Sequence, residues 1–172
     1  MSEDEPPDRE ADFRRFHRQE YPLIIAFLCH LGFSHHIADE AASEALEELY
    51  WSWFDVCTSR RMWVRTTAKR VAVRKAKAER GGPLNRLLDK GFRPQLEHDD
   101  SGLGEVVERH GGLVRAINSL PTSQREAFAL HVDGFTAKEI AAALAIAERT
   151  VHHRIQRART TLRALVASGE EK

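Results

Sequence analysis

The segment that most constrains the fold is residues 120–165, which predict three helices ending in a helix-turn-helix. Apolar residues recur there at helical spacing, at Ile140, Leu144, Ile146, Val151 and Ile155. The run Ala141-Ala142-Ala143 is small enough for two helix backbones to approach closely. The last helix carries arginines at Arg149, Arg154, Arg157, Arg159 and Arg163. A three-helix unit with a basic last helix is suited to placing that helix in the major groove of DNA.

Residues with local structural roles support these helix boundaries. Thr122 or Ser123 is placed to cap the first of the three helices. Gly134 is placed to end it. Thr136 and Glu139 have the spacing of a capping box, which predicts the start of the second helix.

The formal net charge of zero hides a strongly uneven distribution. Residues 1–57 carry a net charge of −9 and residues 58–80 a net charge of +8. Residues 81–112 carry −2, and residues 113–167 carry +4. Salt screens electrostatic interactions beyond about 10 Å, so binding depends on local charge. The two basic segments can therefore bind nucleic acid although the net charge is zero. The acidic segment indicates a different, basic partner.

The helical periodicity predicts an all-α protein, with two small helical domains joined by a linker and a helix-turn-helix in the second. Helices are expected over residues 11–31, 36–54 and 61–79, with Pro22 as a local conflict in the first. No strand pattern competes with them. The expected organisation is an acidic disordered tail, a helical domain, a linker, a helix-turn-helix domain and a short tail, over residues 1–10, 11–80, 81–112, 113–167 and 168–172.

Several classes of protein are disfavoured by the sequence. The longest apolar run, residues 23–31, is too short to span a bilayer, and the acidic N-terminus is unlike a signal peptide. The two isolated cysteines, Cys29 and Cys57, are read as buried free thiols of a reducing compartment. We therefore expect a cytoplasmic protein with no membrane partner.

The sequence also offers no enzymatic or metal-binding pattern. It lacks a glycine-rich phosphate loop, a nucleophile elbow and an HExxH motif, so no catalytic residue, cofactor or small-molecule substrate is expected. The pairs His35-His36 and His152-His153 are adjacent residues, which diverge by roughly 100° around a helix and rarely bind one metal ion together.

The C-terminal motifs resemble region 4 of bacterial sigma factors, in particular the small extracytoplasmic-function type with regions 2 and 4. The resemblance is carried by Leu120-Pro121, Arg125-Glu126-Ala127-Phe128, Gly134-Phe135-Thr136, Glu139-Ile140-Ala141, Thr150-Val151, Arg154, Ala158-Arg159 and Leu162-Arg163. It implies recognition of a "-35" promoter element by the last helix. The candidate contacts are Arg149, Thr150, His152, His153, Arg154, Gln156 and Arg157.

The N-terminal half is similar to region 2 of the same family, in the segments 38–46, Leu49-Tyr50, Trp63-Val64-Arg65 and Ala68-Lys69-Arg70. The resemblance implies that the acidic helix docks on core RNA polymerase, through Asp39, Glu40, Ser43, Glu44 and Glu47. It implies that the basic helix melts and holds the "-10" element, through Arg61, Trp63, Arg65, Lys69, Arg70, Arg74 and Lys77. Core packing is the favoured role of Trp63, with base stacking as the alternative.

The chain departs from the family pattern at several positions. Ser43 replaces the usual Gln, and Arg70 and Arg74 stand where Asn and Asp are common. These arginines should strengthen contact with phosphates and alter readout of the "-10" bases. Ala145 occupies a turn position often held by glycine, and Ala147 lacks a capping hydroxyl.

The leading hypothesis is therefore a non-enzymatic sigma factor that directs core RNA polymerase to specific promoters and helps to melt them. One alternative is a conventional helix-turn-helix regulator whose first domain serves protein interaction. Another is a degenerate sigma paralogue that binds polymerase or an anti-sigma factor without initiating. For each charged helix face, the alternative is a solvent-exposed surface without a binding role.

Overall fold

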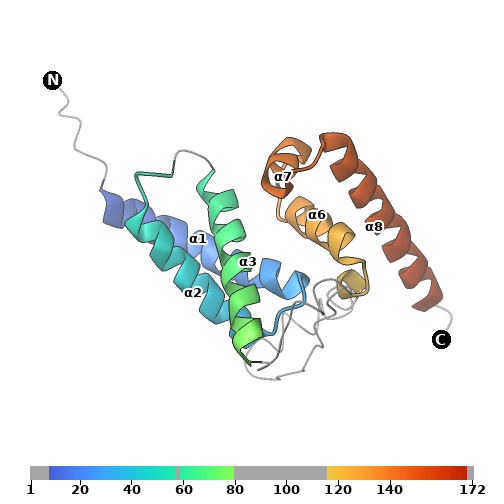
Figure 1. Ribbon diagram of the computed structural model, residues 1–172, viewed down its shortest axis with the longest axis horizontal. Helices are drawn as coiled ribbons and strands as arrows, with labels where there is room; N and C mark the ends of the chain where they lie inside the picture. Colours follow the sequence, from blue (N-terminus) through green and yellow to red (C-terminus); the bar gives the residue numbers. More distant parts are fainter. Residues whose placement is uncertain (1–7, 57–58, 80–115, 170–172) are drawn as a thin grey trace.

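The structure is a computed structural model that describes residues 8–56, 59–79 and 116–169. The described residues form two adjoining helical lobes and contain no strand (Figure 1). The N-terminal lobe holds α1 (Arg9–His30), α2 (His35–Trp51) and α3 (Arg60–Glu79). The C-terminal lobe holds α6 (Thr122–Val132), α7 (Ala137–Leu144) and α8 (Glu148–Gly169). The all-α prediction is thus confirmed, whereas the proposed linker and both tails lie largely outside the described residues.

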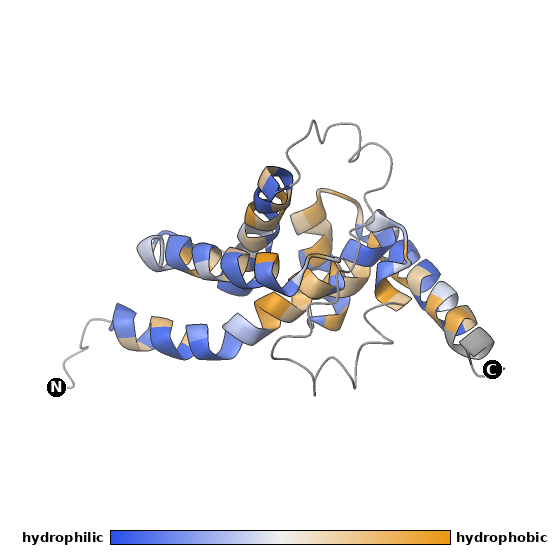
Figure 2. Cartoon of the chain, turned by 90° about the horizontal axis from the view of Figure 1, so that it is seen from below, coloured by the Kyte–Doolittle hydropathy of each residue, from blue (hydrophilic) through white to orange (hydrophobic). Residues whose placement is uncertain are grey.

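Short-range hydrogen bonds set the ends of most helices. The Asp8 side chain accepts from the N–H groups of Glu10 and Ala11 at the start of α1, and Ser34 caps α2 in the same way. Pro22 lies inside α1, which continues past it to His30. Figure 2 shows hydrophobic residues gathered where the helices meet, with hydrophilic residues along the outer faces.

The N-terminal lobe is held together by close packing of α2 against α3. The fully buried positions on the two facing sides are mostly alanines, at Ala38, Ala41, Ala42, Ala45, Ala68 and Ala72. Small side chains bring the two helix backbones close, and Leu46, Leu49, Val64 and Val71 fill the space around them. Trp63 is half-buried and packs against this core.

The C-terminal lobe is a helix-turn-helix supported by α6. Its fully buried side chains come from each helix and the preceding turn, and include Ile117, Leu120, Ile140, Val151 and Ala158. In the alanine run only Ala141 is buried, while Ala142 is exposed. The close approach of helix backbones that was predicted for all three alanines therefore involves Ala141. No described helix combines the length and the hydrophobicity needed to cross a membrane.

Candidate nucleic-acid interface

Helix α8 has one buried side and one exposed side. Val151, Ile155 and Ala158 face the core of the lobe. The exposed side chains are those of Arg149, His152, His153, Gln156 and Arg157, while Thr150 and Arg154 are half-buried. Arg presents two donors to the acceptors of guanine, and Gln can donate to and accept from adenine. The structure therefore brings the predicted duplex contacts onto the solvent side of one helix.

The orientation of α8 is fixed by the two turns before it. The Thr136 hydroxyl accepts from the N–H of Glu139, whose carboxylate accepts from the Thr136 N–H at 2.8 Å, so the predicted capping box is present. Hydrogen bonds to the Glu139 carboxylate from the Thr136 N–H and from the Thr136 hydroxyl lower the pKa of Glu139. Ala145 ends α7 in the left-handed conformation, with φ 52° and ψ 45°. The predicted cap at Thr122 or Ser123 is wrong, because α6 begins after Pro121 without a side-chain cap.

Helix α3 directs its basic side chains to two different neighbours. Arg70 and Arg74 are exposed and pair with α2, through Glu48 and Glu44. Three other residues of the predicted melting site, Arg61, Arg65 and Lys69, contact the C-terminal lobe. Trp63 and Lys77 are half-buried.

Arg65 is the most deeply placed of these side chains, with 0% of its surface exposed. Its Nε donates to Asp133 Oδ2 at 2.6 Å and its Nη2 to Asp133 Oδ1 at 3.2 Å. A second carboxylate, that of Glu20, lies 2.8 Å from Nη2 and is itself buried. A buried charge requires partners of opposite sign, and Arg65 has one from each lobe.

The acidic residues of α2 are divided between two faces. Toward α3, Lys75 Nζ lies 2.9 Å from Glu40 Oε2 and 3.6 Å from Glu44 Oε2. The hydrogen bond from Lys75 lowers the pKa of Glu40. Asp39 accepts from the Tyr21 hydroxyl at 2.7 Å. Among the described residues Glu47 has no ion-pair partner, and its side chain is exposed.

Glu47 borders a groove between α1 and α2 that the sequence did not reveal. The groove has a volume of about 410 Å³ and is lined by Phe13, His17, Ser43, Leu46, Glu47, Tyr50 and Trp51. Trp51 is 68% exposed, which is unusual for so large an apolar side chain. The aromatic residues have no distinctive spacing in sequence, because they come from two helices that are packed side by side.

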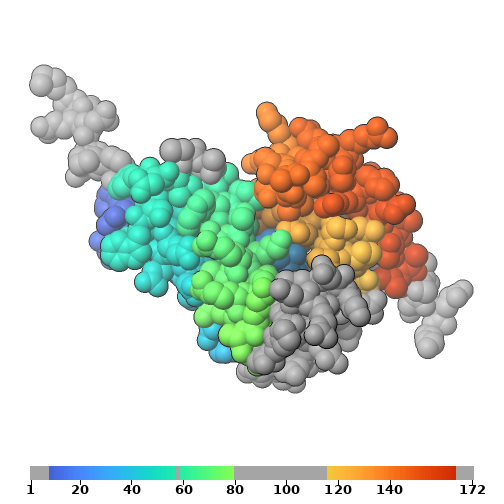
Figure 3. Space-filling model, in the orientation of Figure 1, coloured from blue at the N-terminus to red at the C-terminus, as the bar shows by residue number. Residues whose placement is uncertain are grey.

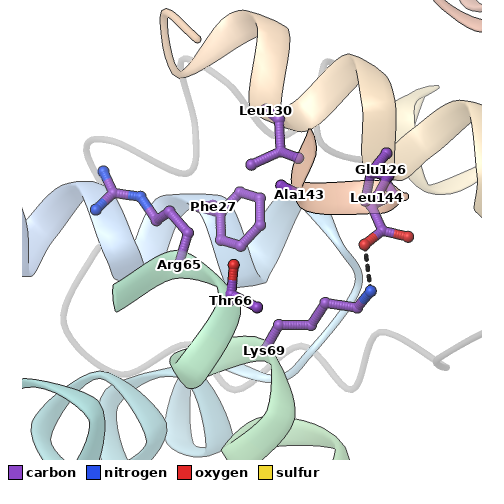
Figure 4. A pocket seen from close by; sticks show the side chains of 8 residues that line it. All are labelled: Phe27, Arg65, Thr66, Lys69, Glu126, Leu130, Ala143 and Leu144. Carbon is purple, nitrogen blue, oxygen red and sulfur yellow. Dashed lines mark hydrogen bonds and ion pairs between the residues drawn. The ribbon is translucent and has the colours of Figure 1, made fainter. Parts of the chain in front are cut away.

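A smaller cavity of about 230 Å³ lies where the two lobes meet (Figure 4). Its apolar lining is Phe27, Leu130, Ala143 and Leu144, and its polar lining is Arg65, Thr66, Lys69 and Glu126. No group of three or more metal-ligating side chains occurs within the described ranges. Burial raises the pKa of the Cys29 thiol to about 11, so this thiol stays protonated at neutral pH, while Cys57 lies outside the described residues.

Residues 110–162 match the family model of sigma-70, region 4. Among solved structures, the chain is similar to the sigma factor RpoE from Bartonella quintana, in a complex with the anti-sigma factor NepR. The TM-score is 0.67 with 21% identity, over 91% of this chain and 97% of that one. It is also similar to CnrH, in a complex with the cytosolic domain of CnrY, with a TM-score of 0.65 and 18% identity over 92% and 90% of the two chains. No curated protein matches the sequence.

The C-terminal lobe is therefore a sigma-70 region 4 domain, and the chain as a whole has the fold of a two-domain sigma factor. The predicted resemblance to sigma factors is thus confirmed for region 4 by the family model, and for the chain as a whole in its fold.

Proposed function

We propose that this protein is a specificity subunit that binds core RNA polymerase, places α8 on a "-35" element and uses α3 to hold the melted "-10" element. The observation that carries the proposal is the exposed face of α8, which presents Arg149, Gln156 and Arg157 from a region 4 domain. The role is non-enzymatic, since the chemistry of initiation belongs to the polymerase. A cytoplasmic location follows from that partnership.

The proposed polymerase-docking surface is the outer side of α2 together with the groove beside it. Glu40 and Glu44 are engaged by Lys75 and Arg74, whereas Glu47 and Trp51 are available to a partner. An exposed carboxylate beside an aromatic groove suits a basic, partly apolar surface. The sequence-based prediction spread the docking site along the whole acidic helix. We narrow the proposed site to Glu47 and Trp51.

Helix α3 is proposed to contact phosphates of the melted strand through Arg61, Arg65, Lys69, Arg70 and Arg74. Single-stranded nucleic acid is held by basic grooves and by aromatic stacking. Trp63 and Lys77 retain their assignment to this site as proposals. An anti-sigma factor is a further proposed partner, because both similar structures are complexes and the RpoE complex contains an anti-sigma factor.

Run-off transcription with purified core polymerase and a library of promoters tests the function directly. A sigma factor gives transcripts from a subset of promoters only when polymerase is present. Binding to a palindromic duplex as a dimer without polymerase would indicate a conventional regulator. Co-purification with polymerase without any transcript would indicate a degenerate paralogue.

A further inference from the structure

Two exposed arginines of α3, Arg70 and Arg74, stand where Asn and Asp are common in sigma factors. They are four positions apart, so their side chains lie on the same face of α3. These side chains are 65% and 61% accessible, and both form ion pairs with α2. Figure 3 shows the surfaces of α2 and α3 meeting on one face of the molecule. The two arginines are therefore accessible to a ligand while α2 holds them.

Two carboxylates of α2, those of Glu48 and Glu44, hold the guanidinium groups. Arg70 Nη2 donates to Glu48 Oε2 at 2.7 Å, and Arg74 Nη2 donates to Glu44 Oε1. The second oxygen of Glu44 lies 3.6 Å from Lys75 Nζ, so α3 holds this carboxylate in turn. Ion pairs as exposed as these contribute little to stability. Their main effect is to fix the direction in which each guanidinium points.

Each paired guanidinium keeps two parallel donors for a further contact. Nη2 carries two N–H groups, one beside the Nε–H and the other beside an N–H of Nη1. When a carboxylate accepts from one of them, the other still forms a two-donor edge with its neighbour. The O6 and N7 atoms of guanine accept from such an edge. The carboxylate also offsets the positive charge, which weakens attraction to a phosphate more than attraction to an uncharged base.

We propose that Arg70 and Arg74 read guanine at two positions of the "-10" element, with Glu48 and Glu44 as positioning residues for the two guanidinium groups. This inference rests on the proposed function of α3. It assigns these two arginines to bases and leaves the phosphates to the other cations of the helix. An arginine that is held in place loses less entropy when the contact forms. Only a base whose acceptors match the fixed direction gains from this, so the ion pairs sharpen base discrimination.

The base preference is measured with promoters randomised at the "-10" element, each linked to a transcribed barcode, and transcribed by core polymerase with the full-length protein. The wild type should favour guanine at least about fivefold at two positions. Arg70→Ala should abolish this preference at one position and Arg74→Ala at the other. Transcripts without any guanine preference would overturn the inference alone. Absence of transcripts from every promoter would overturn the proposed function and the inference with it.

The variants Arg70→Lys and Arg74→Lys distinguish reading of a base from contact with a phosphate. Lysine keeps the positive charge but lacks the planar two-donor edge of arginine. If the arginines read guanine, each lysine variant should lose the preference at its position as the alanine variant does. If they contact phosphates, the lysine variants should keep the wild-type preference at both positions, and that result would overturn the inference.

The variant Glu48→Gln tests the positioning role, because it removes the charge that holds Arg70 and keeps the size of the side chain. It should lower the guanine preference at the Arg70 position about threefold and leave the other position unchanged. Glu10→Gln is the matched control, since it removes the carboxylate of a glutamate–arginine pair within α1. It should leave both preferences unchanged. Equal effects of the two variants would overturn the positioning role, as would reduced transcription from all promoters alike without a change in base preference.

Discussion

The guanidinium of Arg125 donates a hydrogen bond of 3.1 Å to the main-chain oxygen of Leu31, which joins α6 to the end of α1 across 94 positions of sequence. The same guanidinium donates to the main-chain oxygens of Asn118 and Leu120, at 2.8 and 2.9 Å. Only 3% of Arg125 is exposed. A residue of the region 4 motif thus organises the start of its own lobe and ties that lobe to its neighbour.

Replacing Arg125 with alanine should lower the free energy of unfolding by about 3 kcal/mol, because buried carbonyl groups lose a charged donor. Urea denaturation followed by circular dichroism measures this change. Arg18→Ala, at an exposed position of α1, should change stability by no more than about 0.5 kcal/mol. Similar values for the two variants would contradict the structural role of Arg125.

Charge reversal at Glu47 should weaken binding to core polymerase by roughly fivefold, because an exposed ion pair contributes about 1 kcal/mol or less. Stability should be unchanged, since Glu47 has no ion-pair partner among the described residues. Glu44→Lys makes a useful contrast, because it also breaks the contacts with Arg74 and Lys75 and should lower stability. Affinity is measured by fluorescence anisotropy, with Glu10→Lys in α1 as the matched control.

On the recognition helix, Arg149→Ala and Arg157→Ala should each cost about 1–3 kcal/mol of promoter affinity if the side chain reads a base, with relaxed preference at one position. Loss of a phosphate contact would instead weaken binding to all promoters alike. Transcription from a promoter library distinguishes the two results. Arg163→Ala, farther along the exposed side of α8, serves as control. Wild-type behaviour of both test variants would remove α8 from the interface.

The helices could be predicted from local signals in the sequence. The ion pairs between residues far apart in the sequence could not. The capping box of Thr136 and Glu139 depends on residues three positions apart, so its spacing alone predicted it. Arg65 and Asp133 are 68 positions apart, and only the packing of the lobes brings them together. The charge pattern could show that α3 is basic and α2 acidic. It could not show that Arg74 and Glu44 pair with each other. The same charged residues could equally have faced two separate binding partners, and the sequence would be identical in both cases.

Acidification should destabilise the C-terminal lobe through His131. Burial, followed by the charges of Arg159 and His152, lowers the pKa of His131 below its usual 6.5. The unfolded chain therefore binds this proton more tightly, so stability is full above about pH 6.5 and falls as the pH drops through that value. His131→Gln should reduce the drop in melting temperature between about pH 7.5 and 5.5.

Ala145 offers a route to a more stable lobe. Its φ of 52° lies in the left-handed region, where an alanine side chain is disfavoured by about 1–2 kcal/mol and glycine is not. Ala145→Gly should raise the free energy of unfolding by about 0.5–1 kcal/mol, after the greater flexibility of glycine in the unfolded chain is deducted. Ala142→Gly is the matched control. Ala142 is exposed inside α7, where the same change should lower stability by about 0.5–1 kcal/mol. If the two substitutions change the free energy of unfolding in opposite directions, the backbone conformation at Ala145 is the cause. If both lower it, this explanation is contradicted.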